Sequence, residues 1–310
     1  MSYTGPEFDP PRQRRFRRAP LAVGLAALVP GALLGWVAYE GVGRPGGSPG
    51  ADAAGQADPA TPKSAPKSAP VSPTDDAKAA GPSAALPLRG KVVVIDPGHN
   101  PGNFQHASEI NQKVNIGTNW KECDTTGTST NAGYSEARFT LDVAHRLRTL
   151  LERQGATVKL THDADQPAWG PCVTRRAEIG NTAHADAAIS VHADGAPEGD
   201  RGFHVILPAS VHSGAADTRP IVASSHTLGK YVESDFAKVT GSAPSNYVGN
   251  GTGLDVRGDL GGLNLSTVPK VFIECGNMRD SKDAALLTSG AWRQKAAQGI
   301  SEGIVSFLRG

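Results

Sequence analysis

Apolar residues from about residue 88 onwards fall into short runs, and these runs predict β-strands. Continuous apolar runs of this kind are typical of strands that are buried on both faces of a parallel sheet. Residues 157–161 alternate between apolar and polar residues instead, which indicates a short, half-buried strand. The five predicted strands are residues 91–96, 157–161, 187–192, 203–207 and 271–275.

Between the predicted strands, apolar residues recur three or four positions apart, which indicates amphipathic helices. The first helix is predicted over residues 135–154, where Ser135 can serve as the N-cap and Gly155 can end the helix. The other predicted helices are residues 173–183, 228–239 and 292–308. Strands that alternate with helices predict an α/β fold, in which helices cover both faces of one sheet.

Two long segments, residues 100–134 and 241–263, fit neither pattern and are predicted to be loops. Loops of this length in compact domains are usually functional or mobile. The second segment is rich in glycine but lacks the Lys-Ser/Thr pair of a phosphate-binding P-loop. We therefore expect it to form a loop around a cleft.

The N-terminal part of the chain carries an export signal. Residues 21–39 form an uncharged, largely apolar stretch, and five arginines precede it between residues 12 and 18. A bilayer-spanning helix needs about 20 apolar residues, and positive charge keeps its flank in the cytoplasm. A cleaved signal peptide remains an equal alternative, although its apolar core is usually about 7–15 residues. Both interpretations of residues 1–40 place the rest of the chain outside the cytoplasm, secreted or tethered to the membrane.

Residues 41–87 are rich in Pro, Ala, Ser and Gly and repeat a Pro-Lys-Ser-Ala unit within residues 62–70. Such a sequence cannot bury enough apolar surface to offset the entropy of ordering it. We therefore predict a disordered linker over residues 41–87 and one catalytic domain over residues 88–310. The domain is expected to be a monomer.

Charge and cysteine content narrow the function classes. The chain has 31 Lys and Arg against 30 Asp and Glu, a net charge of +1, and its predicted globular part has no basic stripe with aromatics, so nucleic acid is not an expected partner. Three cysteines fit an exported protein with one disulfide. Cys123 and Cys172 lie in predicted loops or loop edges, so we pair them and expect Cys275, within an apolar strand, to be a buried small hydrophobe. The alternative that all three are reduced stays open.

Two histidines and two glutamates are predicted to meet at one edge of the sheet. His99 and His192 follow or close predicted strands, Glu274 lies near the end of another, and Glu136 lies in the first turn of the first helix. In open α/β sheets, ligands bind outside the carboxyl ends of the strands. Two imidazoles and a carboxylate make a catalytic zinc set with an open position for water. We therefore predict that His99, Glu136 and His192 bind Zn²⁺ and that Glu274, its pKa raised by burial, transfers protons.

Other roles for these residues remain open from the pattern alone. Glu136 could serve only to stabilise the N-terminus of the helix through the helix dipole, and Glu274 could be paired with an arginine. Five other histidines are rejected because they lack the strand-end position, and two are expected to be structural. The rejected residues are His106, His162, His204, His212 and His226, and the structural ones are His145 and His184.

Five motifs in this order resemble the zinc-dependent N-acetylmuramoyl-L-alanine amidases, and the likeness extends over essentially the whole predicted domain. The motifs are residues 94–99, 135–138, 175–181, 185–194 and 268–277. The resemblance implies hydrolysis of the amide between N-acetylmuramic acid and the L-alanine of the peptidoglycan stem peptide. It implies Glu136 as a zinc ligand and Glu274 as the catalytic glutamate, with peptidoglycan or muropeptides as substrate.

The resemblance also implies a twisted, mostly parallel sheet of about six strands. Residues 254–256 or 263–265 are the candidates for the sixth strand. The sequence Glu274-Cys275-Gly276-Asn277 departs from the family's usual Glu-Leu-Gly, and residues 100–134 are longer than expected. We hypothesise that this segment, pinned by the Cys123–Cys172 disulfide, partly covers the metal. Two rival functions remain, a zinc peptidase that cuts elsewhere in the stem peptide and a catalytically silent wall-binding module. No substrate-contact residue is identified.

Overall fold

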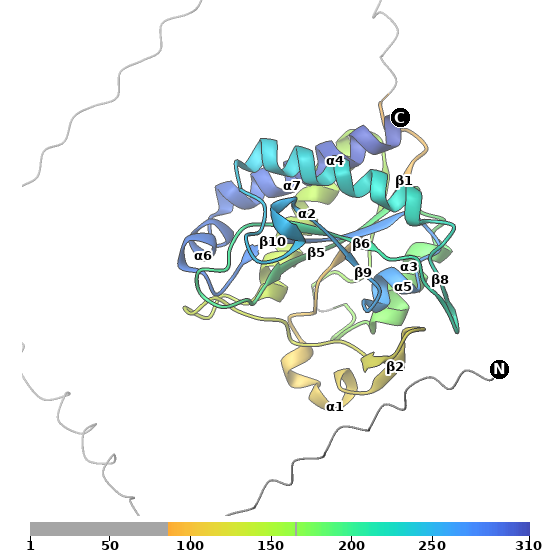
Figure 1. Ribbon diagram of the computed structural model, residues 1–310, viewed down its shortest axis with the longest axis horizontal. Helices are drawn as coiled ribbons and strands as arrows, with labels where there is room; N and C mark the ends of the chain where they lie inside the picture. Colours follow the sequence, from red (N-terminus) through yellow and green to blue (C-terminus); the bar gives the residue numbers. More distant parts are fainter. Residues whose placement is uncertain (1–85, 165) are drawn as a thin grey trace, which may run out of the picture. The chain divides into compact units, whose positions relative to one another are not determined.

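The computed structural model describes residues 86–164 and 166–310, drawn in colour in Figure 1. The predicted anchor or signal peptide at residues 21–39 lies outside the described residues, as does nearly all of the predicted linker at residues 41–87. None of the helices in the described ranges is long and apolar enough to cross a membrane.

Six strands form the central sheet, in the order β4-β1-β5-β10-β6-β9. The β4-β1-β5-β10 part is parallel, β6 runs antiparallel to β10, and β9 is parallel to β6. The prediction of a mostly parallel, six-stranded α/β sheet is therefore confirmed. The strands are β1 (Val92–Pro97), β4 (Thr157–Leu160), β5 (Ala187–Asp194), β6 (His204–Pro208), β9 (Leu254–Arg257) and β10 (Lys270–Asn277).

Residues 254–256 lie within β9 and supply the sixth strand, as the first of the two candidates predicted. The other candidate, residues 263–265, is wrong, because it includes the end of a short helix, α5 (Gly261–Asn264). The side chain of Leu263 is buried in this helix, which explains why the segment is apolar without being a strand.

Alternation along the strands makes the two faces of the sheet chemically different. Partner residues on neighbouring strands leave the sheet on the same face. The face occupied by Ile95, Ile189 and Ile273 is wholly apolar and belongs to the main core. The opposite face carries polar side chains towards the carboxyl ends of the strands. These are Asp96, Ser190, His192 and Glu274, with Phe272 among them.

Helices cover both faces, as predicted. The apolar face packs against α2 (Glu136–Arg153), α4 (Val222–Thr240) and α7 (Gly290–Arg309), whereas α3 (Val173–Thr182) and α5 lie on the other side of the sheet (Figure 1). A further short helix, α6 (Ser281–Leu287), was not predicted.

The helix α4 begins six residues before the predicted first residue, because its first turns carry Ser224, Ser225 and His226 and show no apolar periodicity. Ser135 lies at the N-cap of α2 as expected, but its side chain makes no capping hydrogen bond. The contact between α4 and α7 is unusually close. A Cβ at Gly303 would lie 2.6 Å from the Cα of Val232, so glycine is required there.

The prediction that residues 100–134 and 241–263 lack regular structure is wrong in part. Their elements are only three or four residues long, so they leave no apolar period in the sequence. The disulfide partner Cys123 and the buried Ile110 and Ile116 anchor the first segment to the domain. It contains η1 (Asn103–Gln105), α1 (Ala107–Ile110), β2 (Lys113–Asn115) and β3 (Trp120–Glu122), and the second contains η2 (Gly249–Gly251), β9 and α5. A second small hairpin joins β7 (His212–Ser213) to β8 (Ala216–Asp217).

Candidate metal centre and active-site cleft

Three side chains converge at the carboxyl edge of the sheet. His99 follows β1, His192 lies on β5 and Glu136 is the first residue of α2. One potential ligand atom from each lies within 4.8 Å of the others. Glu136 lies between the two imidazoles, 3.0 Å from Nε2 of His99 and 2.9 Å from Nδ1 of His192. Zinc binds such atoms at about 2.0–2.2 Å, so one ion can reach all three ligands.

Backbone groups and an aromatic ring hold these side chains in place. The N–H of Thr128 donates to Oε2 of Glu136 at 2.9 Å, and the N–H of Ala193 donates to Oε1 at 3.2 Å. The ring of His192 stacks on Phe272 with the centroids 4.0 Å apart. Each oxygen of Glu136 therefore faces one histidine while a backbone donor fixes it from another side.

Two glycines leave room for the ligands. A Cβ on Gly98 would overlap the imidazole of His192. A Cβ on Gly127, where φ is +73°, would lie 2.7 Å from both Oε2 of Glu136 and Cδ2 of His99. The main chain thus lies so close to these side chains that only glycine fits at both positions.

The charges of the three groups suit a metal ion. Burial opposes ionisation of Glu136, but His99 and the hydrogen bond from His192 outweigh it and hold the pKa of the carboxyl well below its usual range. Burial lowers the pKa of His192, which favours the neutral imidazole. Burial would also lower the pKa of His99, but the Glu136 carboxylate raises it, so a metal ion competes with a proton there. Two imidazoles and an ionised carboxylate form a donor set that fits Zn²⁺.

Glu274 lies on β10, in register with His192 on β5. Its Oε2 is buried and has no hydrogen-bond partner among the described residues. Burial raises the pKa of Glu274 well above its usual value, and the negative charges of Glu136 and Asp194 add to this effect. A buried carboxyl oxygen without a partner is costly for folding, so its place in the same cleft as His99, Glu136 and His192 indicates a chemical role.

All four predicted site residues line one cleft of about 360 Å³. Part of its wall comes from residues 121–125, within the segment predicted to be a loop, and another part comes from residues 259–262. Across the cleft, Nζ of Lys121 lies 3.4 Å from Oδ2 of Asp259, and Arg257 donates to both oxygens of Asp259 at 2.8 Å. The proposed covering of the metal by residues 100–134 stays a prediction.

The sequence profile of the N-acetylmuramoyl-L-alanine amidase family matches residues 93–306, nearly all of the described domain. The chain belongs to this family. The Mycobacterium tuberculosis protein N-acetylmuramoyl-L-alanine amidase Rv3717 is 38% identical over 222 residues, which make up 71% of this chain and 88% of that relative.

Solved structures agree with this amidase fold. The amidase Ami1 from Mycobacterium smegmatis is similar with a TM-score of 0.65 and 38% identity, over 71% of this chain and 98% of that one. The apo form of Ami1 from Mycobacterium abscessus has a TM-score of 0.64 and 39% identity, over 71% of this chain and the whole of that one. Members of the family are zinc-dependent cell-wall hydrolases, which agrees with the donor set in the cleft.

The amidase contains the predicted disulfide. Cys123 and Cys172, 49 positions apart in the sequence, are bonded, and Cys275 is a buried free thiol. The bond connects the segment after β3 to the N-terminus of α3, both of which lie beside the cleft.

One histidine that was rejected from the sequence lies at the same edge of the sheet as Glu274. His204 is the first residue of β6 and is paired across the strands with Glu274. It was rejected because it does not end a strand. Because β6 is antiparallel to β10, however, its start lies at the edge where β10 ends. Nδ1 of His204 is buried and has no hydrogen-bond partner in the described ranges.

A buried ion cluster that was not predicted from the sequence forms part of the cleft wall. Asp96 on β1 lies 2.9 Å from Nη1 of Arg176 and 3.1 Å from Nζ of Lys270, and it accepts a hydrogen bond from Ser190 at 2.7 Å. A usable signal was present, because Asp96 is a carboxylate within an apolar run, as Glu274 is.

Proposed function

We propose that this amidase hydrolyses the amide bond between N-acetylmuramic acid and the L-alanine of the stem peptide. In this proposal His99, Glu136 and His192 hold Zn²⁺, and Glu274 transfers the protons. One observation carries the proposal. The three donor atoms lie within 4.8 Å of one another, beside the unpaired Oε2 of Glu274 in a shared cleft.

Each part of the reaction has a residue suited to it. When bound, zinc supplies a Lewis acid that polarises the amide carbonyl and makes water acidic enough to attack near neutral pH. Oε2 of Glu274 takes a proton from the attacking water and gives it to the amine nitrogen as the C–N bond breaks. The raised pKa of Glu274 suits this exchange, because it makes the ionised carboxylate a stronger base towards the attacking water. The products are a free carboxyl on the lactyl group and a peptide that begins with L-alanine.

The family acts on the cell wall, so the reaction takes place outside the cytoplasm. We further propose that residues 21–39 export the domain, as a cleaved signal peptide or a membrane anchor, and that residues 41–87 link it to the membrane or the processed end. The domain works as a monomer in this proposal. Mass spectrometry of the N-terminal peptide of the exported protein distinguishes cleavage from anchoring.

Digestion of purified muropeptides by the zinc-loaded protein tests the reaction. Mass spectrometry should find the intact stem peptide separated from the sugar, and a chelator should stop the reaction until zinc is added back. Loss of D-alanine or internal stem-peptide fragments would instead indicate the rival zinc peptidase. Absence of any cleavage by zinc-loaded protein would support the silent wall-binding module.

The metal ligands are tested separately from the reaction. His192→Ala should remove most of the bound zinc, as measured by elemental analysis, because the remaining two ligands cannot complete the site. His212→Ala is a matched control, because His212 is exposed on β7 and away from the three ligands. Full zinc occupancy in the His192 variant would contradict the assignment.

A further inference from the structure

We propose that Asp124, Thr125 and Arg176 form a clamp that holds His99 in the conformation needed for metal binding. These three residues, called the clamp below, would be positioning residues, because none of them belongs to the ligand set. The proposal rests on the metal centre proposed above and adds the residues that orient one of its ligands.

His99 needs support from outside its own strand. It lies two residues after the end of β1, and its φ of +61° is in the left-handed region that residues with a Cβ rarely adopt. The ladder of β1 therefore does not fix its backbone, and the backbone conformation itself is unfavourable. Such a conformation persists when surrounding contacts determine it.

Thr125 orients the imidazole of His99. Nε2 of His99 faces Glu136 at 3.0 Å, and Nδ1 faces the carbonyl oxygen of Thr125 at 3.0 Å and its hydroxyl at 3.1 Å. A carbonyl can only accept, so Nδ1 carries the proton and Nε2 is left as the ligand atom. A hydrogen bond of this kind sets both the ring orientation and the tautomer of a metal-binding histidine.

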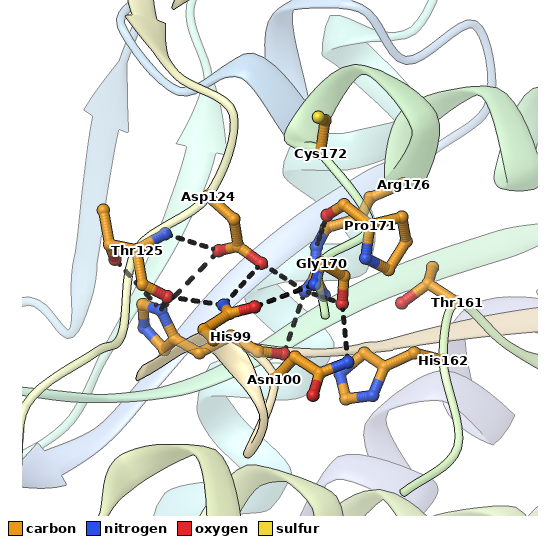
Figure 2. Close-up of polar contacts among 12 residues, drawn as sticks. His99, Asn100, Asp124, Thr125, Thr161, His162, Gly170, Pro171, Cys172 and Arg176 are labelled. Carbon is orange, nitrogen blue, oxygen red and sulfur yellow. Dashed lines mark hydrogen bonds and ion pairs between the residues drawn. The ribbon is translucent and has the colours of Figure 1, made fainter. Parts of the chain in front are cut away.

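Asp124 fixes the Thr125 backbone. One oxygen of the buried Asp124 carboxylate accepts from the N–H of Thr125 at 2.8 Å, and the other accepts from Nδ2 of Asn103 at 3.1 Å. The same Nδ2 donates to the carbonyl of Thr125 at 2.8 Å. Figure 2 shows Asp124 between Thr125 and His99 on one side and Arg176 on the other. Asp124 thus fixes the N–H of Thr125, and Asn103 fixes the carbonyl that orients His99.

Arg176 connects the backbone of His99 to the carboxylate of Asp124. Its Nη2 donates to the carbonyl of His99 at 2.9 Å and to Asp124 at 2.8 Å (Figure 2). Its Nη1 donates to the carbonyl of Pro97 at 2.6 Å. A planar guanidinium can make these bonds at once, whereas a lysine ammonium cannot reach the same set. Arg176 therefore fixes the backbone of His99 relative to the carboxylate that fixes Thr125.

The disulfide holds both parts of the clamp together. Cys123 directly precedes Asp124, and Cys172 is the N-cap of α3, the helix that carries Arg176. The N–H of Val173 also donates to the carbonyl of Cys123 at 2.7 Å. The clamp is thus anchored covalently at the point where its two segments meet.

Zinc affinity separates a positioning role from simple support of the fold. Asp124→Asn replaces an acceptor oxygen with a donor that faces other donors. We expect it to weaken zinc binding about 10–100-fold, the usual effect of losing an outer-shell partner of a metal ligand. Asp283→Asn is the matched control, because Asp283 is also buried and bonded to an arginine and to backbone N–H groups, but outside the metal centre.

Two measurements make the comparison. Competition with a chromophoric chelator gives the zinc affinity, and thermal unfolding with and without zinc gives the stabilisation by the ion. Both substitutions should lower the melting temperature of the metal-free protein. Only Asp124→Asn should also reduce the rise in melting temperature that zinc produces. Equal zinc affinity in the two variants would overturn the proposal.

A milder pair of variants covers the case in which Asp124→Asn does not fold. Thr125 is exposed, so Thr125→Val removes one of the two acceptors of His99 Nδ1 with little risk to the fold. It should weaken zinc binding by a smaller factor than Asp124→Asn, and Thr125→Ser should restore the affinity. Thr149→Val, on the exposed side of α2, controls for the substitution itself. Identical affinities in Thr125→Val and Thr125→Ser would then overturn the clamp.

The outcomes also separate this proposal from the proposed function. Loss of zinc in His192→Ala, with no loss in the clamp variants, would reject only the clamp. Absence of zinc binding by the unmodified protein would reject the metal centre itself.

Discussion

Glu274 and His192 are direct partners on the neighbouring parallel strands β10 and β5, so their side chains leave the sheet on the same face. This relationship explains how residues 82 positions apart in the sequence reach one cleft. It also explains why the pKa of Glu274 is raised, since Oε2 is buried on this face and the negative charge of Glu136 is near.

Replacement of Glu274 should separate catalysis from metal binding. Glu274→Gln keeps the shape of the side chain but cannot take up a proton, so turnover of muropeptides should fall about 10²–10⁴-fold. Zinc content should stay unchanged, because Glu274 is not in the ligand set. Glu233→Gln on α4 is the control, since burial also raises the pKa of Glu233, outside the cleft. Ordinary turnover by zinc-loaded Glu274→Gln would remove Glu274 from the mechanism.

The close approach of Gly98 to His192 gives a second prediction. Gly98→Ala places a methyl group within the space of the His192 imidazole, so the ring must move away from Glu136. We expect loss of zinc and of activity with the fold retained, as measured by elemental analysis and circular dichroism. Gly290→Ala at the start of α7 should change neither, because its Cβ would meet only the end of the Arg293 side chain at 3.8 Å. Normal zinc content in Gly98→Ala would contradict the steric argument.

The strands that carry the site were predictable because they are buried on both faces. Residues 91–96, 187–192 and 271–275 stand out as apolar runs, and β1, β5 and β10 coincide with them within three residues at either end. The rule that ligands bind at the carboxyl ends of parallel strands then identifies His99, His192 and Glu274 as neighbours. All three residues line the same cleft.

Features that depend on strand direction or on tertiary contacts were not predictable. The position of His204 beside Glu274 follows from β6 being antiparallel, and an apolar run is the same in either direction. The Asp124–Arg176 contact joins residues 52 positions apart, and each has mostly polar neighbours in the sequence. The hairpin of β2 and β3 is short and mostly exposed, so it leaves no periodic signal.

The disulfide should contribute substantially to stability. Cys123 and Cys172 close a loop of 49 residues, for which chain entropy gives about 4 kcal/mol, and measured effects are often smaller. Cys123→Ala with Cys172→Ala should therefore lower the unfolding free energy by about 2–4 kcal/mol in urea denaturation. Reductant should destabilise the unmodified protein but leave the double variant unchanged, because only the buried thiol of Cys275 remains. Equal sensitivity of both proteins to reductant would contradict this assignment.

The buried ion cluster should make stability depend on acid pH. Burial opposes ionisation of Asp96, but Lys270 and Arg176 outweigh it and hold the pKa of Asp96 well below its usual range. The unfolded chain has an aspartate pKa of about 3.9, so below that value the unfolded state takes up a proton that the folded state resists. The stabilisation is therefore complete above about pH 5 and is lost as the pH falls.

Asp96→Asn tests this linkage. At pH 7 it leaves Lys270 without its buried partner and Arg176 with Asp124 alone, so the unfolding free energy should fall by about 3–5 kcal/mol. As the pH decreases from about 6 to 3, the unmodified protein should lose stability faster than the variant, and the gap between them should narrow. Urea denaturation of both proteins in chelator measures the gap without any contribution from metal. Asp186→Asn, which breaks a partly exposed pair with Lys91, should give a much smaller gap at pH 7. A gap between Asp96→Asn and the unmodified protein that stays constant over this range would show that the charge of Asp96 does not stabilise the fold.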